Sequence, residues 1–94
     1  MRKASARHIL VESRDLCEAL KKQIQDGADF VALAREHSLC PSGEHGGDLG
    51  EFYPGQMVLE FDKVVFNETL NEVHGPVETQ FGFHLIEITS RSDS

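Results

Sequence analysis

Two segments at opposite ends of the chain constrain its fold most. Residues 6–12 and residues 84–89 both fit the two-residue period of a β-strand. His8 lies in the first segment and His84 in the last, each on a face that also carries aliphatic side chains. If the two strands are neighbours in one sheet, we expect the two imidazoles to meet near its centre.

A first helix is predicted directly after the first strand. Leu16, Leu20 and Ile24 recur every four residues and form an apolar stripe. Ser13 is suited to the N-cap of this helix. Gly27 stands where a helix ends in the left-handed conformation.

Two further helices are predicted downstream. Asp29 is suited to cap the second helix, and residues 60–67 form a short third one. The side chains predicted to face the core from these helices are Phe30, Leu33, Ala34, Phe61, Val64 and Val65.

The periodic pattern stops between residues 38 and 53, where glycine and proline indicate a loop with no structure of its own. Residues 53–56 fit a type II turn. Residues 75–77 fit the start of an edge strand, where proline removes no ladder hydrogen bond. The order of elements predicts one α+β domain over residues 1–94, with a small antiparallel sheet covered by helices.

The charge balance excludes several classes of partner. Nine basic residues against sixteen acidic ones give a formal charge of −7. Nucleic acids and anionic membrane surfaces attract clustered Lys and Arg, so neither is an expected partner. The chain also lacks the ~20 consecutive apolar residues of a membrane-spanning helix. Nothing in the apolar pattern requires a second copy, and we expect a monomer.

The expected compartment is the cytoplasm. Residues 1–8 are too short and polar for a secretory signal. Cys17 and Cys40 form at most one disulfide, and two free thiols are the favoured interpretation. Cys17 lies one position off the first helix stripe and is expected to be half-buried. His37 and His45 are expected to be exposed, and neither they nor His74 has an assigned role.

Pattern alone does not assign a chemical role to the histidines. For either histidine alone, the better explanation is a core or boundary histidine with one hydrogen bond. Met57, Phe61, Phe81 and Phe83 suit a core as well as a pocket. A family resemblance separates these alternatives.

The chain closely resembles the parvulin family of peptidyl-prolyl cis/trans isomerases, in its compact single-domain bacterial form. The matching stretches are HILV (8–11), GADF (27–30), Leu33-Ala34, Ser38, GGDLG (46–50), GQMV (55–58), Phe61 and TQFGFH (79–84). The resemblance implies a four-stranded antiparallel sheet flanked by three to four helices, as in parvulins and FKBP-like proteins. It implies catalysed rotation about X-Pro bonds of unfolded or flexible segments, with no cofactor and no metal.

The resemblance also implies which residues form the site. His8, His84 and Cys40 match the family's catalytic positions. Met57 and Phe61, with Phe81 beside them, match the apolar cup that holds the proline ring, and Gln56 is placed to bond the substrate backbone. We hypothesise that the two histidines are a neutral, mutually hydrogen-bonded pair that Cys40 joins.

One branch of the family recognises phosphorylated residues before proline through a longer, Arg-rich connection after the first strand. Here that connection is only residues 12–14. Anion capture requires clustered arginines, so phosphate specificity is not expected. An uncharged or hydrophobic residue before the proline is the predicted preference.

Three rival functions remain. Cys40 with a histidine is the chemistry of a thiol nucleophile. His8, Cys40 and His84, with His37 or His45, would be a metal site, although no ligand spacing supports it. A domain that holds proline-containing segments without isomerising them is the third.

Overall fold

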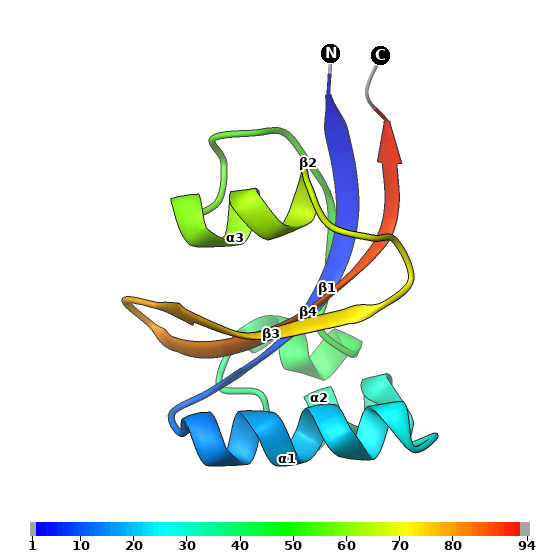
Figure 1. Cartoon of the computed structure of the whole chain (residues 1–94), viewed down its shortest axis with the longest axis vertical. Coiled ribbons are helices and arrows are strands. Elements are labelled where there is room, and N and C mark those ends of the chain that lie inside the picture. The colour runs from blue at the N-terminus through cyan, green and yellow to red at the C-terminus, as the bar shows by residue number, and fades with distance from the viewer. Residues whose placement is uncertain (1, 93–94) are drawn as a thin grey trace.

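The computed structural model describes residues 2–92 and has one four-stranded antiparallel sheet with the strand order β2-β1-β4-β3. Figure 1 shows this sheet with helices on both faces. The elements are β1 (Lys3–Val11), α1 (Arg14–Gln25), α2 (Phe30–His37), the 3₁₀ helix η1 (Pro41–His45), β2 (Asp48–Phe52), α3 (Leu59–Val65), β3 (Val73–Thr79) and β4 (Gly82–Ser92). The predicted fold class is confirmed.

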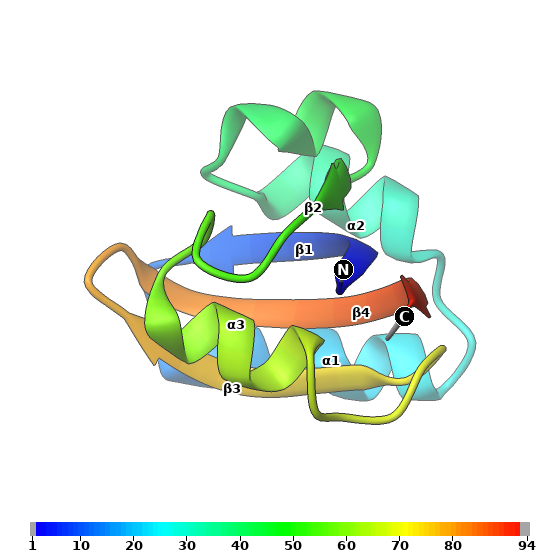
Figure 2. The ribbon, with the colours of Figure 1, turned by 90° about the horizontal axis from the view of Figure 1, so that it is seen from above.

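The two end strands are central neighbours, as the histidine argument required. In the register of β1 and β4, His8 faces Ile86 and His84 faces Leu10, so the histidines are diagonal neighbours. Both lie on the face covered by α3, whereas α1 and α2 cover the other face (Figure 2). The alternation predicted for both strands is confirmed, because Ile9 and Leu85 pack on the opposite side.

Helix α1 begins and ends where the sequence predicts, but its buried stripe is rotated. The Ser13 hydroxyl accepts a hydrogen bond from Leu16 N at 3.3 Å, and Gly27 has a φ of 109°. Leu16, predicted to be buried, is 38% exposed, and Cys17, predicted to be half-buried, is 0% exposed. The buried stripe contains Cys17 in place of Leu16, because a spacing of three and then four residues follows the helical period more closely than two steps of four.

The other two α-helices differ little from prediction. Asp29 occupies the N-cap position of α2, but its side chain makes no capping hydrogen bond. Helix α3 lies within two residues of the predicted range, and Phe61 and Val65 are buried on its inner side. No helix in the described part of the chain is long and apolar enough to cross a bilayer.

The region from residue 38 to residue 53 is not the structureless loop that the residues alone predicted. It contains η1 and the edge strand β2, which pairs with β1 from Ala4↔Phe52 to Arg7↔Asp48. Glycine and acidic residues are disfavoured in strands, which hid β2 from a pattern analysis. The fourth strand implied by the family resemblance is this one.

The second edge strand, β3, starts two residues before the predicted range. Its register shifts between His74 and Val77, where Pro76 sits in the bulge. The predicted type II turn is also present, since Gln56 N donates to Tyr53 O at 3.2 Å and Gly55 has a φ of 91°.

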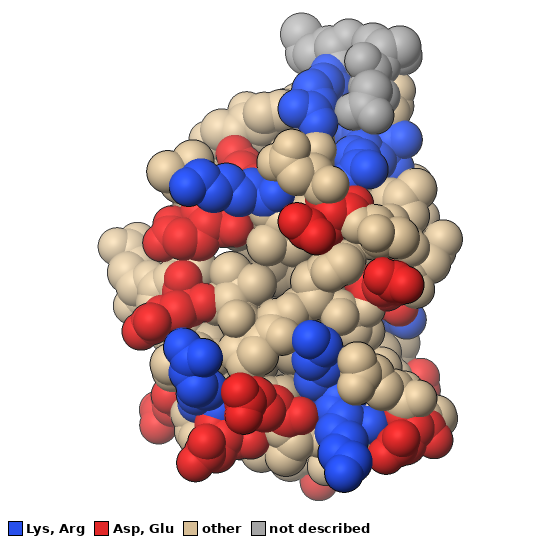
Figure 3. Space-filling view, in the orientation of Figure 1, with Lys and Arg blue, Asp and Glu red and all other residues tan. Residues whose placement is uncertain are grey.

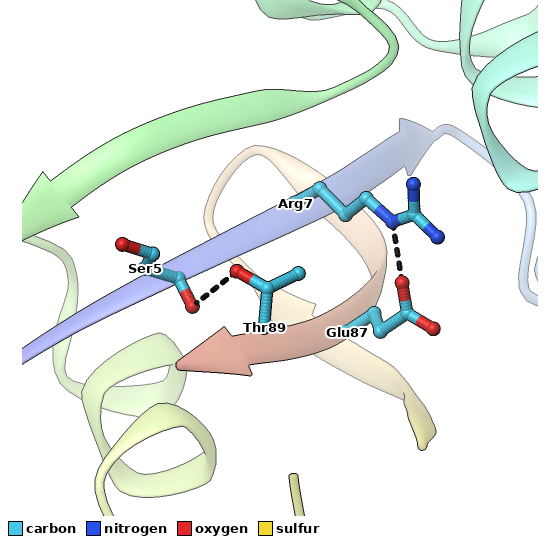
Figure 4. A network of polar contacts seen from close by, with 4 residues as sticks. All are labelled: Ser5, Arg7, Glu87 and Thr89. Carbon is cyan, nitrogen blue, oxygen red and sulfur yellow. Dashed lines mark hydrogen bonds and ion pairs between the residues drawn. The ribbon is translucent and has the colours of Figure 1, made fainter. Parts of the chain in front are cut away.

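A second polar pair joins β1 and β4 on the face opposite the histidines. Arg7 forms an ion pair with Glu87, its partner in the sheet register, and its guanidinium lies 4.6 Å from the centroid of the Phe30 ring. Thr89 Oγ1 donates to Ser5 O at 3.1 Å beside this pair (Figure 4). Figure 3 shows basic and acidic side chains close to one another on the face of the molecule that it displays, with uncharged residues between them.

Candidate active site

One pocket of about 530 Å³ opens on the α3 face of the sheet. The residues that line it are His8, Leu10, Leu39, Cys40, Pro41, Leu49, Gln56, Met57, Val58, Phe61, Phe81 and His84. They include all seven residues that the sequence predicted for the site. Their catalytic and binding roles stay predictions, whereas their convergence on one cavity is a property of the structure.

The two histidines form the floor of this pocket. His8 Nδ1 and His84 Nδ1 lie 3.1 Å apart, and the two residues are 6% and 4% exposed. The Phe61 ring stands nearly perpendicular to both imidazoles, with centroid distances of 5.6 Å and 5.9 Å. The predicted histidine pair is therefore held from above by an aromatic edge and from below by the sheet.

Hydroxyl groups extend the histidine pair in both directions. His8 Nε2 lies 3.2 Å from Ser42 Oγ, which donates to Cys40 Sγ at 3.3 Å. His84 Nε2 lies 2.8 Å from Thr79 Oγ1, which accepts from the backbone N of Phe81 at 3.1 Å. One continuous chain of hydrogen bonds thus runs from Cys40 to the turn before β4.

One set of proton positions satisfies every member of this chain when Ser42 donates to Cys40. Ser42 has one hydroxyl proton and gives it to Cys40, so Ser42 accepts from His8 Nε2. A neutral His8 then accepts at Nδ1 from the Nδ1–H of His84. His84 Nε2 in turn accepts from the hydroxyl of Thr79. Each imidazole is assigned one neutral tautomer, and every ring nitrogen has a partner.

Burial keeps both imidazoles uncharged. Desolvation, with a smaller contribution from the neighbouring His84, lowers the pKa of His8 from 6.5 to about 4. Desolvation also lowers the pKa of His84, against an opposing effect of Glu60. At neutral pH the floor of the pocket therefore carries hydrogen bonds but no charge.

A glycine lets the η1–β2 segment approach the first strand. His8 N donates to Gly47 O at 3.0 Å, and a Cβ on Gly47 would lie 2.2 Å from His8 O. Gly47 also has a φ of 84°, which side-chain-bearing residues rarely adopt. This contact places the segment that carries Cys40 and Ser42 over the edge of the pocket.

The three residues of the apolar cup differ in how deeply they are buried. Phe61 is 3% exposed and belongs to the core, Met57 is half-buried, and Phe81 is 61% exposed. The turn before Met57 is anchored twice, because Gly55 N donates to Asp62 Oδ2 at 2.6 Å and Tyr53 N donates to Gln56 Oε1 at 2.7 Å. The oxygen of Gln56 thus holds the turn, and the predicted contact with a substrate backbone falls to its NH₂ group.

Sequence reasoning missed Ser42 and Thr79. Serine and threonine are common in loops and at strand ends, so neither residue type signals a site by itself. Thr79 does begin the TQFGFH stretch that ends in His84, and Ser42 lies two residues after Cys40. Their proximity to predicted site residues was the signal available.

The remaining cysteine and histidines lie outside the site. Cys17 is buried on the opposite face, where burial raises the pKa of its thiol to about 11, and both cysteines are unpaired. His45 is exposed as predicted, whereas His37, also predicted to be exposed, is half-buried. Within residues 2–92, no group of three or more His, Cys, Asp or Glu side chains could hold a metal ion.

The contacts described for Cys40 reach His8 only through Ser42.

Known proteins match the chain along almost all of its length. The model of the PPIC-type PPIase domain, or rotamase, matches residues 4–90. The foldase protein PrsA of Halalkalibacterium halodurans is 46% identical over 90 residues, which are 95% of this chain and 27% of that protein.

Solved structures agree with the sequence match. The crystal structure of PrsA from Bacillus subtilis aligns with a TM-score of 0.89 at 42% identity, over 94% of this chain and 35% of that one. The solution structure of NmPin, a parvulin of Nitrosopumilus maritimus, aligns with a TM-score of 0.86 at 32% identity, over 96% and 98% of the two chains. The chain thus spans about a third of the PrsA relatives but nearly the whole of a parvulin. With this family match over residues 4–90, the chain belongs to the PPIC-type peptidyl-prolyl cis/trans isomerase family, the parvulins.

Proposed function

We propose that the enzyme catalyses cis/trans rotation about X-Pro bonds in unfolded or flexible protein segments, without a covalent step. We also propose that it prefers an uncharged, hydrophobic residue before the proline. The observation that carries this proposal is the neutral histidine pair beneath an apolar cup. Such a site offers shape, dryness and hydrogen bonds, and it offers no charged group to an anionic substrate.

The chemistry of rotation suits a dry, neutral pocket. The amide bond resists rotation with a barrier of ~18–20 kcal/mol because its resonance must be broken. In the twisted transition state the carbonyl has lost conjugation and carries less charge than the planar amide. An apolar site therefore favours the transition state over the ground state. An acceleration of ~10⁴-fold requires about 5.5 kcal/mol of such preference.

The cup and the floor divide this task. Met57, Phe61 and Phe81 hold the pyrrolidine ring, so that the rest of the peptide rotates against a fixed proline. The hydrogen-bonded floor under the ring keeps its polar groups paired with each other, so it does not compete for the rotating carbonyl.

Cys40 serves in this proposal as a hydrogen-bond partner of Ser42 and makes no bond to the substrate. Cys40→Asp replaces one acceptor by another and should keep kcat/KM within about tenfold, since a single hydrogen bond contributes ~0.5–1.5 kcal/mol. Cys40→Ala removes the acceptor and tests the same contact. A loss of more than about a thousandfold in both variants would favour a covalent nucleophile.

The connection between β1 and α1 supports the predicted preference. Glu12 is acidic, and the guanidinium of Arg14 lies 5.3 Å from the centroid of the Phe83 ring. Capture of a phosphate requires several arginines directed at one anion. Leu10 and Leu39 line the pocket on this side and favour an apolar neighbour for the proline.

The preference is tested with Ala-X-Pro-Phe peptides in which X is Leu, Glu or phosphoserine. Two-dimensional NMR exchange measures cis/trans rotation directly and needs no coupled protease. We expect the Leu peptide to exchange fastest, and Met57→Ala to slow it. Fastest exchange with phosphoserine would overturn the preference. Binding without faster exchange for every X would favour a holding domain.

We also propose that the chain acts as a monomer in a reducing, cytoplasmic compartment. Two free thiols are compatible with this compartment. Fractionation of cells that express the chain tests the location, and recovery outside the cytoplasm would contradict it. Sedimentation of the purified chain tests the monomer.

A further inference from the structure

A second hollow of about 300 Å³ lies beside the active-site pocket, at the end of β1. The residues that line it are Val11, Glu12, Ser13, Leu16, His37 and Leu39. Leu39 also lines the active-site pocket, so one leucine side chain separates the two cavities. The hollow therefore adjoins the pocket in which the proline is proposed to bind.

The dividing leucine is fixed from its backbone. Leu39 N donates to Leu10 O at 2.8 Å, and Leu10 N donates to Ser38 Oγ at 3.1 Å. These two bonds tie the segment after α2 to the end of β1. The Leu39 side chain is nevertheless 56% exposed, so the fold holds an apolar group in water at this boundary.

Exposed apolar side chains concentrate along this path. Among the described residues, the exposed large hydrophobic ones are Leu16, Leu39, Tyr53, Leu59 and Phe81. Three of these five line the pocket or the hollow. Single exposed hydrophobic residues are normal, but several exposed apolar side chains that line an active-site pocket and a hollow next to it are typical of a binding surface.

The polar groups of the hollow restrict what it accepts. The Ser13 hydroxyl already caps α1, and His37 Nε2 lies 3.8 Å from Glu36. Glu12 adds a negative charge at the edge, and neither Lys nor Arg lines the hollow. An anionic group would find no partner there, whereas an aliphatic or aromatic side chain would contact Val11 and Leu16.

We propose that this hollow binds a second apolar side chain of the same substrate, from a residue outside the X-Pro pair. An extended peptide advances about 3.3 Å per residue, so roughly two residues carry it across one leucine side chain. This inference rests on the proposed preference for flexible segments and deepens it. Unfolded chains expose the large apolar side chains that folded proteins mostly bury, so the hollow favours unfolded clients.

The test uses longer peptides with Leu-Pro at the centre and serine elsewhere. A single additional leucine is placed in turn at each position from four to two residues before the proline and from one to three residues after it. NMR exchange gives kcat/KM for each peptide. We expect leucine at one or two adjacent positions to raise kcat/KM about three- to tenfold over serine, as partial burial of one leucine predicts.

The matched variants are Leu16→Gln and Leu59→Gln. Leu16 is 38% exposed and lines the hollow, whereas Leu59 is 65% exposed and lines neither cavity. The measured quantity is the ratio of kcat/KM between the leucine and serine peptides. Leu16→Gln should reduce this ratio to about one, and Leu59→Gln should preserve it. The Leu16 backbone amide should also shift in the NMR spectrum when the leucine peptide is added.

Three results would overturn the inference. The first is a wild-type enzyme for which no outer leucine exceeds serine. The second is a gain that survives Leu16→Gln, and the third is a gain that Leu59→Gln removes equally. The Ala-X-Pro-Phe series tests the residue before the proline separately, so its preference and the hollow can each fail while the other stands.

Discussion

The two faces of the sheet carry two polar pairs built on the same two strands. On the α3 face, His8 and His84 share a hydrogen bond and are almost fully buried. On the face of α1 and α2, Arg7 and Glu87 form an ion pair whose side chains are 31% and 16% exposed (Figure 4). Arg7 and His8 are consecutive residues, so the strand alternation alone separates a charged pair from a neutral one.

The difference in access to water explains why the Arg7–Glu87 pair is charged and the histidine pair is neutral. The Arg7–Glu87 pair lies at the margin of the core, where solvent reduces the cost of keeping two charges. The histidines lie under Phe61 and beside the apolar cup, where burial lowers their pKa and keeps them neutral. On the face of α1 and α2, an ion pair therefore lies at the margin of the core. On the α3 face, uncharged imidazoles form the floor of the pocket, where a substrate must lose its water.

The largest expected effect compares one phenylalanine from each face. Phe61 and Phe30 are both 3% exposed, and each packs against its own polar pair. Each change to alanine should remove about 3–5 kcal/mol of stability. Isomerase activity per folded molecule should fall only for Phe61→Ala, because Phe30 lies across the sheet from the pocket. Urea unfolding and NMR exchange measure the two quantities.

If either alanine variant fails to fold, leucine variants at the same two positions allow Phe61 and Phe30 to be compared. Phe61→Leu and Phe30→Leu conserve more volume and should cost about 1.5 kcal/mol or less. Equal activity losses in both would contradict the assignment of catalysis to one face. Full activity in a folded Phe61→Leu would remove Phe61 from the cup.

The second prediction concerns acid and the histidine face. The folded chain protonates His8 near pH 4, whereas the unfolded chain does so near pH 6.5. The unfolded state thus binds more protons between these values, so stability is full above about pH 6.5 and falls as the pH drops to about 4. The loss assigned to His8 is about 3 kcal/mol. Urea unfolding at a series of pH values measures it.

His8→Asn is the control for this acid effect. Carboxylates also titrate near pH 4, and the variant retains them while it removes the imidazole. At pH 7 the variant should also be less stable than the wild type, since Ser42 and His84 lose their shared partner. An unchanged pH slope would mean that His8 is not held neutral by burial. Unchanged stability with lost activity would leave the pair no structural role.

The fold was largely predictable because its strongest signals are local. The end strands and the caps at Ser13 and Gly27 follow from alternation and backbone geometry. Strand β2 was not predictable from its residues, because its pairing with β1 supplies the stability that its glycine and carboxylates lack. The buried stripe of α1 contains Cys17 in place of Leu16, and the helical period of 3.6 residues already favours this spacing.

The convergence of the seven predicted residues on one cavity was predictable only through resemblance to a family. Alternation placed His8 and His84 on inward faces, but whether they met depended on the strand order. Ser42 and Thr79 complete the hydrogen-bond chain through loop and turn geometry that no periodicity encodes. The hollow beside Leu39 likewise arises where the segment after α2 meets the end of β1.

The smallest expected effect concerns the charged pair itself. Arg7→Met and Glu87→Gln should each lower stability by about 1 kcal/mol, since the pair is partly exposed and screened by water. The double variant should show a coupling of about 0.5–1 kcal/mol that salt weakens. Isomerase activity should stay within about twofold in all three, because neither side chain lines the pocket. A larger loss of activity at unchanged stability would mean that the two faces communicate through β1. The charged pair would then tune the imidazoles across the sheet, and the separation of the faces by alternation alone would be wrong.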